Sequence, residues 1–424
     1  MQPTTLIWFR RNLRVADNAA LHTALQRGLP VAGIWISEEG RTNPRQALFL
    51  HRSAAELHQA LAACGIPLYG LQGNAEQLVS EWADALHAAA VVADEAYTPS
   101  ELWADNRIWH ALDKKNIPFI RVNDRSIFAK SELTDRYGMP YRTFPEYRQA
   151  WLQAYAQRFR YKQPVSYTAA DGILQTALDG LPPFPANLYT PSIVVQHKGG
   201  EAAGEKQWAQ FAAEIGFYPL QKDFPARKGT GQISAYLTAG CLSARSLAAQ
   251  AWQQQHRAWL DTLIRRDFHL QTAFHMPSAN QEPADHPVSS RYLERWQAGQ
   301  TGFPLIDAAM RALKRSGWLH PALREAVALF WCGTLKQPWQ SGAAWFAAQL
   351  TDYEPAANQG NWQEACAQTA PPPLYWAQKL DPDGTFVRRH LPELAHLPSE
   401  LVHTPHLAGA NADTHGYPPP MIKV

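Results

Sequence analysis

A change of hydrophobic pattern near the middle of the chain constrains the fold most strongly. Up to about residue 124, short apolar runs rich in β-branched residues alternate with segments of helical periodicity. The apolar runs are Thr5 to Phe9, Pro30 to Ile36, Val91 to Ala93 and Ile117 to Val122. This alternation is typical of a parallel sheet covered by helices. The sequence therefore predicts an open, doubly wound α/β domain in the N-terminal part.

The strand pattern disappears from Gly200 onward, where helix-length amphipathic segments take over. A Pro- and Tyr-rich stretch, which includes GMPYRTFPEY, separates the two patterns and is typical of a linker. A chain of 424 residues also exceeds the roughly 250–300 residues at which a single hydrophobic core stops growing. We therefore expect an α/β domain at 1–124, a connector at 125–197 and an all-helical domain at 198–424.

Charge and hydropathy leave the partner open. The formal net charge of +2 and the isoelectric point of about 8.3 neither demand nor exclude nucleic acid. The start MQPTTLIWFRR holds too short an apolar run for a signal peptide, and no segment approaches ~18 uninterrupted apolar residues. We expect a soluble, cytoplasmic monomer that does not contact a membrane.

The cysteines predict neither a metal site nor a disulfide. Cys64, Cys241, Cys332 and Cys366 form no CxxC pair and lack the histidine spacing of a zinc site. Widely spaced cysteines of this kind are typically free thiols in a reducing compartment. We therefore expect buried, unbonded thiols.

No GxGxxG motif follows the first predicted strand, so the sequence does not support a dinucleotide held there by a glycine turn. The segment instead continues as Arg10-Arg11-Asn12-Leu13-Arg14. Two interpretations of these arginines are open, a solvated loop or a group of structural ion pairs.

The stretch from Trp318 to Trp362 combines features that a large polar cofactor with an apolar ring requires. It holds a candidate ion pair, Arg324 with Asp352, followed by a turn with Glu354 and Asn358. Carboxylates accept hydrogen bonds from ribose hydroxyls or a ring N–H, whereas an amide both donates and accepts without a titratable proton. Such an amide can contact the edge of a flavin and tune its redox state. The alternative is a structural turn without a ligand.

A glycine- and hydroxyl-rich segment, Lys228-Gly229-Thr230-Gly231-Gln232-Ile233-Ser234, leads into a predicted helix. Free backbone N–H groups and the helix dipole favour a phosphate at such a position. The alternative is an ordinary capped helix start. Arg266 and Arg324 are able to pair with phosphate or carboxylate, although an exposed arginine usually binds nothing specific.

Several long motifs occur in the order and spacing of one known family. WFRRNLRVADNAAL at 8–21 is similar to the family opening WFRxDLRxxDNxAL, with Asn12 in place of the usual Asp. The other matching segments are YPLQKDFPARKGTGQISAYLTAGCLSAR at 218–245, TGFPLIDAAMRALKRSGWLHPALR at 301–324, DYEPAANQGNW at 352–362 and FVRRHLPEL at 386–394. Over its whole length the chain resembles the DNA photolyase/cryptochrome flavoproteins.

The resemblance implies that the helical domain binds FAD, folded so that adenine lies near the isoalloxazine. The positions that match the phosphate-binding segment are Tyr218, Thr230, Gly231, Gln232, Ile233 and Ser234. The positions that match the surroundings of the remaining cofactor are Trp259, Arg266, Arg324, Asp352, Tyr353, Glu354 and Asn358. By the same resemblance Asn358 faces the reactive flavin nitrogen, and Glu354 replaces a frequent Asp.

The resemblance also implies electron transfer to the flavin. Trp362 and Trp339 match the proximal and middle members of the tryptophan chain that photoreduces the cofactor. The outer member falls near His286, where no Trp occurs. The candidate substitutes are Trp331, Trp345 and Trp376. Packing is the alternative role of each.

The lesion-binding positions depart from the family pattern. Thr262 and Arg265 stand where photolyases carry a Glu that donates to the pyrimidine dimer and a Trp that stacks on it. Losing a stacking partner costs ~1–3 kcal/mol per base. Pro321, Ala322 and Glu325 replace an Asn, a DNA-contacting Arg and a Met beside the lesion.

Two hypotheses of function follow. In the first, the protein is a deoxyribodipyrimidine photolyase, in which reduced FAD excited by blue light passes an electron to a pyrimidine dimer. Lys222, a basic residue where photolyases have a DNA-facing Arg, retains part of the attraction to DNA. In the second, it is a non-repairing cryptochrome-like photoreceptor or a DNA-associated regulator. We expect no long signalling tail, because the chain ends in HGYPPPMIKV soon after the last family motif.

The antenna pigment is open at this stage. Glu101 matches a position that contacts a folate antenna in the family, but Ser100 replaces its Asn partner. The antenna is accordingly of folate type, of deazaflavin type or absent.

Overall fold

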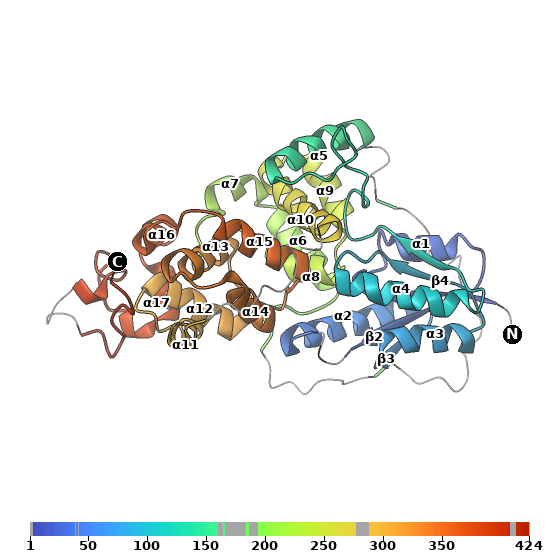
Figure 1. Ribbon diagram of the computed structural model, residues 1–424, viewed down its shortest axis with the longest axis horizontal. Coiled ribbons are helices and arrows are strands. Elements are labelled where there is room, and N and C mark those ends of the chain that lie inside the picture. The colour runs from blue at the N-terminus through green and yellow to red at the C-terminus, as the bar shows by residue number, and fades with distance from the viewer. Residues whose placement is uncertain are drawn as a thin grey trace. The chain divides into compact units, whose positions relative to one another are not determined.

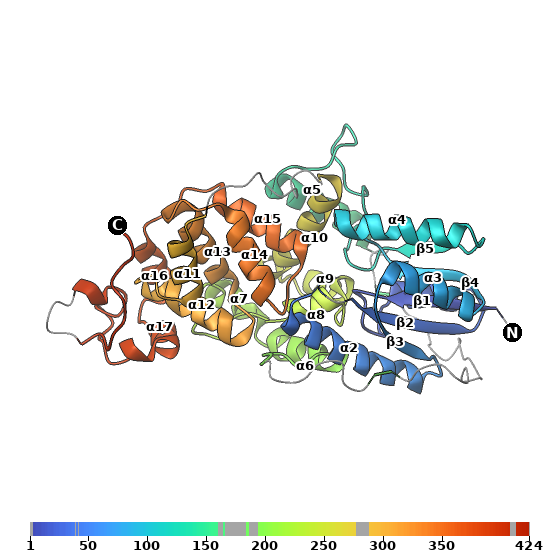
Figure 2. The same cartoon turned by 60° about the horizontal axis from the view of Figure 1, so that its bottom comes forward.

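The computed structural model describes residues 3–38, 40, 42–159, 164–165, 184–185, 194–276, 288–407 and 413–423. The chain divides into two compact units, which Figures 1 and 2 show as ribbons. Unit 1 comprises Met1–Ile193, His197–Ala213 and Gln232–Asn280. Unit 2 comprises Val194–Gln196, Glu214–Gly231 and Gln281–Val424.

Unit 1 contains a five-stranded parallel sheet with the strand order β3-β2-β1-β4-β5. The strands are β1 (Thr4–Phe9), β2 (Val31–Ser37), β3 (Leu68–Gln72), β4 (Ala88–Asp94) and β5 (Phe119–Val122). The helices between them are α1 (Ala19–Leu25), α2 (Pro44–Ala63), α3 (Ala75–Ala85) and α4 (Pro99–Asp113), which lie on both faces of the sheet (Figures 1 and 2). The predicted doubly wound α/β fold is therefore confirmed.

Alternating side-chain directions along the fully buried strand β1 place one set of residues against α3 and α4. Leu6 and Trp8 of β1 point to the same face and join Trp82 of α3 and Ile108 of α4 in one apolar cluster. Further helices of unit 1 are α5 (Phe144–Arg158), α6 (Glu201–Ala212), α8 (Ser234–Ala239), α9 (Ala244–Gln253) and α10 (Arg257–His275). The helices at 201–212 and 234–275 thus cluster with the sheet, although their sequence pattern resembles that of the helices of unit 2.

Buried ion pairs decide between the two interpretations of the arginine cluster. Arg10 pairs with Asp94 and Asp105 at 3.1 and 2.6 Å. Arg14 Nη2 lies 2.8 Å from the Asp124 carboxylate, with the two side chains 2% and 0% exposed. The structural ion-pair interpretation is therefore correct for Arg10 and Arg14, which hold the loop after β1 against neighbouring strand ends.

Unit 2 is built from helices, and its described residues contain no β-strand. The helices are α7 (Tyr218–Gln221), α11 (Ser290–Ala298), α12 (Pro304–Ser316), α13 (Pro321–Leu329), α14 (Trp339–Gln349), α15 (Pro355–Cys366), α16 (Pro373–Leu380) and α17 (Thr385–His390). A π-helical turn, η5 (Phe330–Thr334), extends α13. Proline in the first turn begins α12, α13, α15 and α16, since the missing N–H has no helical partner there. The predicted helical region is confirmed.

Neither a membrane-spanning helix nor a metal-binding cluster occurs among the described residues. None of their helices is both long and apolar enough to cross a membrane. The same residues contain no cluster of His, Cys, Asp and Glu that is able to hold a metal ion.

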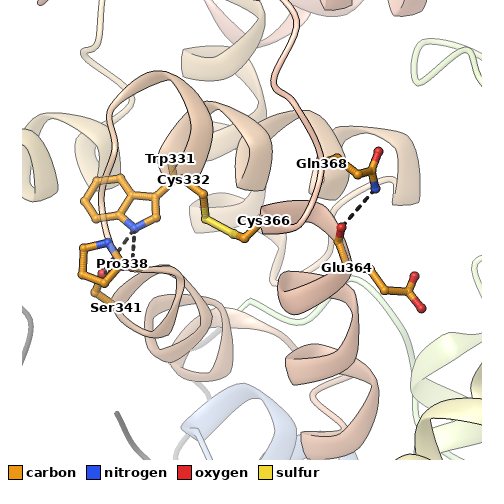
Figure 3. Close-up of a disulfide and its surroundings, with 7 residues drawn as sticks. All are labelled: Trp331, Cys332, Pro338, Ser341, Glu364, Cys366 and Gln368. Atoms are coloured by element: carbon orange, nitrogen blue, oxygen red, sulfur yellow. Dashed lines mark hydrogen bonds between the residues drawn. A yellow bond between two sulfur atoms is a disulfide. The ribbon is translucent and has the colours of Figure 1, made fainter. Parts of the chain in front are cut away.

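The expectation of four unbonded thiols is wrong for two cysteines. Cys332 of η5 and Cys366 at the end of α15 form a disulfide, with Cα atoms 5.6 Å apart (Figure 3). Their sequence separation of 34 gives no sign of this proximity, which arises because α13 packs along α15. Cys64 and Cys241 are free, as expected, but only Cys241 is buried.

Loss of the buried charge at Asp124 should destabilise unit 1. In Asp124→Asn the Arg14 guanidinium stays buried without its carboxylate, so we expect the free energy of unfolding to fall by about 3–5 kcal/mol. Urea denaturation followed by circular dichroism measures this change. As a matched control, Glu76→Gln removes the carboxylate that pairs with the exposed Arg107 and should leave the midpoint almost unchanged. Equal effects of the two substitutions would contradict the structural role of the buried pair.

Candidate functional site

An ion pair joins α13 to the turn before α15. Arg324 Nη2 donates to Asp352 Oδ2 over 2.7 Å, and Arg324 Nε donates to the Leu319 carbonyl over 2.8 Å. The Asp352 side chain is 1% exposed, against 27% for Arg324. A buried carboxylate requires such a partner because its desolvation is costly. The candidate pair recognised in the sequence is thus formed, and it leaves the arginine partly accessible.

The turn after Asp352 starts α15 with a side-chain cap. Glu354 Oε2 accepts a hydrogen bond from the Ala357 N–H over 2.7 Å, which satisfies one of the free donors of the first helical turn. The Glu354 side chain is buried in this position. One role of Glu354 is therefore to fix where α15 begins.

Contacts with α14 orient the middle of α15. Asn358 Nδ2 donates to the Ala343 carbonyl of α14 over 3.1 Å. One turn further, the Trp362 indole packs on Gly342, where an added Cβ would lie 2.2 Å from the ring. Residues four positions apart share one face of a helix, so Asn358 and Trp362 lie on a common side of α15.

Aromatic rings continue from Trp362 into the core of unit 2. The Trp362 ring centroid lies 5.2 Å from that of Phe346 and 6.3 Å from that of Trp296. Trp296 in turn lies 4.7 Å from Trp331. Trp339, the expected middle member of the electron chain, begins α14 and packs against the same core while partly exposed. The position near His286 lies outside the described residues.

His320 is a site residue that the sequence analysis missed. It precedes α13, and its Nδ1 accepts a hydrogen bond from the Ala322 N–H over 3.3 Å. Burial, together with the neighbouring charge of Arg324, lowers the pKa of His320 to about 4. Its Nε2 is buried and has no hydrogen-bond partner among the described residues. A neutral imidazole with one unsatisfied nitrogen is thus held beside the Arg324–Asp352 pair, and only its position before a Pro-initiated helix hinted at this role.

The segment 218–231 supplies a further unsatisfied group. Tyr218 begins α7, and Lys222 after it pairs with Asp223 at 3.1 Å. Gly229 packs closely, since a Cβ there would lie 2.5 Å from Gln221 Cβ. The Thr230 hydroxyl is buried and has no hydrogen-bond partner among the described residues. A buried hydroxyl of this kind fits an external polar ligand.

Five predicted cofactor positions belong to unit 1, namely Gln232, Ile233, Ser234, Trp259 and Arg266. Gln232 has a φ of 51°, a left-handed conformation unusual for a residue with a side chain, and it precedes the Ile233–Ser234 helix start. Trp259 of α10 is 4% exposed and its ring lies 4.6 Å from that of Trp208. Arg266 of the same helix donates to the carbonyls of Arg125 and Leu237. The side chains of Trp259 and Arg266 are therefore also anchored within unit 1.

The positions that match the family's lesion site differ in exposure and in their contacts with the protein. Thr262 is exposed and its hydroxyl donates to the Trp259 carbonyl of its own helix over 2.7 Å. The Arg265 guanidinium lies over the Phe144 ring, 3.9 Å from its centroid. Pro321 and Glu325, in unit 2, are exposed on α13, and Ala322 is partly exposed.

Glu101 has a structural task in unit 1. It accepts from the N–H groups of Tyr97 and Thr98 and pairs with Arg125 at 2.9 Å. Burial raises the pKa of the Glu101 carboxyl, but the nearby charges of Arg125 and Arg11 lower it more. The pKa of Glu101 therefore lies well below its ordinary value. Glu101 therefore stays ionised and caps α4.

The polar groups of unit 2 fit a flavin nucleotide. In unit 2 the Asp352 carboxylate accepts from hydroxyl or ring N–H groups, and the Asn358 amide is uncharged at any ordinary pH. The unsatisfied Thr230 hydroxyl and His320 Nε2 are further groups able to bond a polar ligand. This donor and acceptor set, with buried indoles beside it, matches FAD.

Comparison with known proteins supports the same cofactor. A family model described as the FAD binding domain of DNA photolyase matches residues 259–424, and a DNA photolyase model matches residues 5–165. Deoxyribodipyrimidine photo-lyase from Vibrio cholerae is 31% identical over 94% of this chain and 92% of its own length. Cryptochrome DASH from Gloeobacter violaceus is 29% identical over 95% of this chain and 88% of its own length. The crystal structure of a bacterial class III photolyase from Agrobacterium tumefaciens superposes with a TM-score of 0.89 at 25% identity, covering 100% and 95% of the two chains.

The parallel α/β unit, the helical unit and the match to an FAD binding domain place the protein in the class of flavin-nucleotide proteins. Within that class, the chain belongs to the DNA photolyase/cryptochrome family and carries the family's FAD-binding domain. The resemblance seen in the sequence motifs is thereby confirmed.

Protonation of His320 should reduce stability at mildly acidic pH. Because the folded-state pKa of about 4 lies below the ordinary 6.5, the unfolded state binds more protons between these values and stability falls as pH falls. Between about pH 7.5 and about pH 5.0 we expect wild type to lose about 2 kcal/mol more than His320→Asn, whose amide also caps α13. Urea titrations at both pH values measure the difference. The same pH dependence in both proteins would show that His320 is not buried in its neutral form.

Proposed function

We propose that the protein is a light-driven deoxyribodipyrimidine photolyase that uses FAD and has weakened lesion selectivity. The observation that carries the proposal is the arrangement at the start of α15, where Asp352, paired with Arg324 of α13, is followed by Asn358 and Trp362 of α15. Family membership supplies the second support, because relatives of nearly the same length are named deoxyribodipyrimidine photo-lyase.

Each side chain of unit 2 has a stated task in this proposal. Asp352, fixed by Arg324, accepts hydrogen bonds from the cofactor, and Asn358 contacts the flavin edge without delivering a proton. Trp362, with Trp339 as its partner, donates electrons that reduce the cofactor. When bound and reduced, FAD supplies the excited-state electron that splits the dimer.

The remaining cofactor contacts are proposed from their matching positions. They comprise Tyr218, Thr230, Gly231, Gln232, Ile233, Ser234, Trp259, Arg266, Tyr353 and Glu354. The functional boundaries at residues 124 and 198 are likewise part of the proposal. We assign no antenna pigment to Glu101, because its carboxylate already caps α4 and pairs with Arg125.

DNA is the proposed partner, and Lys222 is its proposed backbone contact. Lys222 is partly exposed and pairs with the neighbouring Asp223. The two side chains are 40% and 44% exposed, so the pair is solvated. Solvated pairs of this kind are weak, so the ammonium group is available to a phosphate. We propose that the protein acts on DNA as a cytoplasmic monomer.

Dimer loss under blue light tests the proposal. FAD-loaded protein with chemically reduced flavin should remove cyclobutane dimers from an oligonucleotide in the light and leave them intact in the dark. Chromatography of the digested oligonucleotide measures the dimers. Binding without dimer loss would overturn the repair proposal and favour a non-repairing flavoprotein.

Restoring the family residues on α10 should improve lesion recognition. Thr262→Glu combined with Arg265→Trp adds a donor and a stacking ring on exposed positions. We expect the ratio of damaged to undamaged DNA affinity to rise about tenfold, since stacking contributes ~1–3 kcal/mol per base. Fluorescence anisotropy at fixed salt measures both affinities. The control Arg257→Trp places the same ring at the other end of α10, and an equal gain there would contradict the proposed lesion site.

The second candidate function is a non-repairing photoreceptor or DNA-associated regulator. The observation that favours it is the loss of stacking and positive charge at exposed positions of α10 and α13. It shares the flavin chemistry of the first candidate, so the two differ in dimer loss alone.

A further inference from the structure

The disulfide lies at the end of the aromatic series that begins at Trp362. Trp331, which closes the series, is followed directly in the chain by Cys332 (Figure 3). On α15, Asn358, Trp362 and Cys366 are spaced by four residues, about 6 Å of helix rise per step. The residue proposed to contact the flavin, the first indole and one sulfur therefore lie along one side of the same helix.

The indoles of this series are shielded from water and the cysteines are not. Trp362, Trp296 and Trp331 are 3%, 0% and 0% exposed, whereas Cys332 and Cys366 are both partly exposed. Short ring separations of 6.3 and 4.7 Å favour electron hopping between the indoles, because tunnelling falls steeply with distance. Electrons can therefore pass between indoles that are shielded from water. The cysteines at the end of this path are accessible to protons and reductants in solvent.

The hydrogen bonds of the inner indoles keep an oxidised ring reactive. Trp331 Nε1 donates to the Pro338 carbonyl over 2.9 Å and to Ser341 Oγ over 3.2 Å. Trp296 Nε1 is buried with no acceptor among the described residues. Neither a carbonyl nor a hydroxyl is basic enough to remove the proton of an indole radical cation. The oxidised indole therefore stays a strong oxidant and is refilled by an easier donor.

We propose that Cys332 and Cys366 form a redox-active dithiol that is the terminal electron donor for photoreduction of the flavin. In this role the pair takes the place of the outer tryptophan that the chain lacks. The inference rests on the flavin part of the proposed function and is independent of DNA repair.

The chemistry balances over two photons. The two thiols lose two electrons and two protons, and one S–S bond forms between Cys332 and Cys366. The electrons refill the oxidised indoles and so replace the two that reach FAD, which is the oxidant. One proton accompanies them to FAD and the other goes to solvent. A cellular thiol then reduces the disulfide by thiol–disulfide exchange at the exposed sulfurs.

The backbone around the pair suits repeated bond formation. The Cα separation of 5.6 Å lies within the range that a disulfide requires, so the bond forms without backbone movement. Cys332 belongs to the π-helical turn η5, an irregularity that frequently occurs at functional sites. Gly333 holds this turn against Ala370, where an added Cβ would lie 2.2 Å from Ala370 Cβ.

The other cysteines lack these features and provide a control. Both belong to unit 1. Cys241 is fully buried, and burial raises its thiol pKa to about 12, so it stays protonated and inert. Cys64 is a free thiol that is partly exposed, as Cys332 and Cys366 are, but it is not bonded to another sulfur.

Thiol counting under light tests the proposal. FAD-loaded protein with oxidised flavin and reduced cysteines is freed of reductant without oxygen and exposed to blue light. Alkylation followed by peptide mass spectrometry should show the loss of two alkylatable thiols, Cys332 and Cys366, per flavin reduced, and no loss in the dark. Flavin reduction that leaves both thiols alkylatable would overturn the proposal.

Two variants test separately whether the cysteine pair donates electrons and whether the electrons pass through Trp331. Cys332→Ser should abolish most flavin photoreduction in the absence of an added donor and recover it with dithiothreitol, whereas Cys64→Ser should behave as wild type. Trp331→Phe should prevent the light-driven disulfide although a chemical oxidant such as diamide still forms it. Unchanged light-driven bond formation in Trp331→Phe would overturn the route, and unchanged yield in Cys332→Ser would overturn the donor.

The same experiment separates this inference from the flavin proposal. Photoreduction of wild type only in the presence of added donor overturns the dithiol role alone. Absence of photoreduction even with added donor overturns the flavin proposal as well.

Discussion

The ion pair between Arg324 and Asp352 joins α13 to the turn that leads into α15, the helix that carries the proposed chemistry. One guanidinium binds both the Leu319 carbonyl before α13 and the Asp352 carboxylate before α15, so it ties two chain segments that are far apart in sequence. Since Asp352 is 1% exposed, removing Arg324 would leave a buried charge, a change that typically costs 3–5 kcal/mol. The same buried carboxylate is the proposed acceptor for the cofactor, so stability and binding depend on one group.

From that start, α15 distributes three functions at regular intervals. Asn358, Trp362 and Cys366 recur every four residues, which gives a cofactor contact, an indole and a sulfur on one side of the helix. The close approach of α14 at Gly342 keeps this side in register, because any side chain at that position would displace the Trp362 ring. Packing between two helices thus fixes the position of the Trp362 ring, to which the proposal assigns electron transfer.

Periodicity and local chemistry made much of this structure predictable from sequence. Strands β1, β2, β4 and β5 contain β-branched residues, whereas β3 (LYGLQ) was not recognised because it has none. The Arg324–Asp352 pair was recognised because its residue types suit one another, and the structure contains it. The Cys332–Cys366 bond was not foreseen, because only the packing of α13 along α15 brings positions 34 residues apart together. Trp296 and His320 were missed for the same reason, since burial next to a site has no local signature.

Substitutions at the positions that match the lesion site affect stability less than substitutions at the proposed flavin positions. The Thr262 hydroxyl donates to the Trp259 carbonyl of its own helix. Pro321 and Glu325 are exposed. Exposed positions of this kind usually change stability by less than ~0.5 kcal/mol, whereas Asp352 and Trp362 are buried among partners. The proposed DNA-contacting positions are therefore free to change, whereas the residues proposed for flavin binding and electron transfer are held by packing. Because the two sets are separable, an intact photoreduction apparatus is compatible with strong, weak or absent dimer repair, and dimer loss under light is the measurement that distinguishes a photolyase from a photoreceptor in this chain.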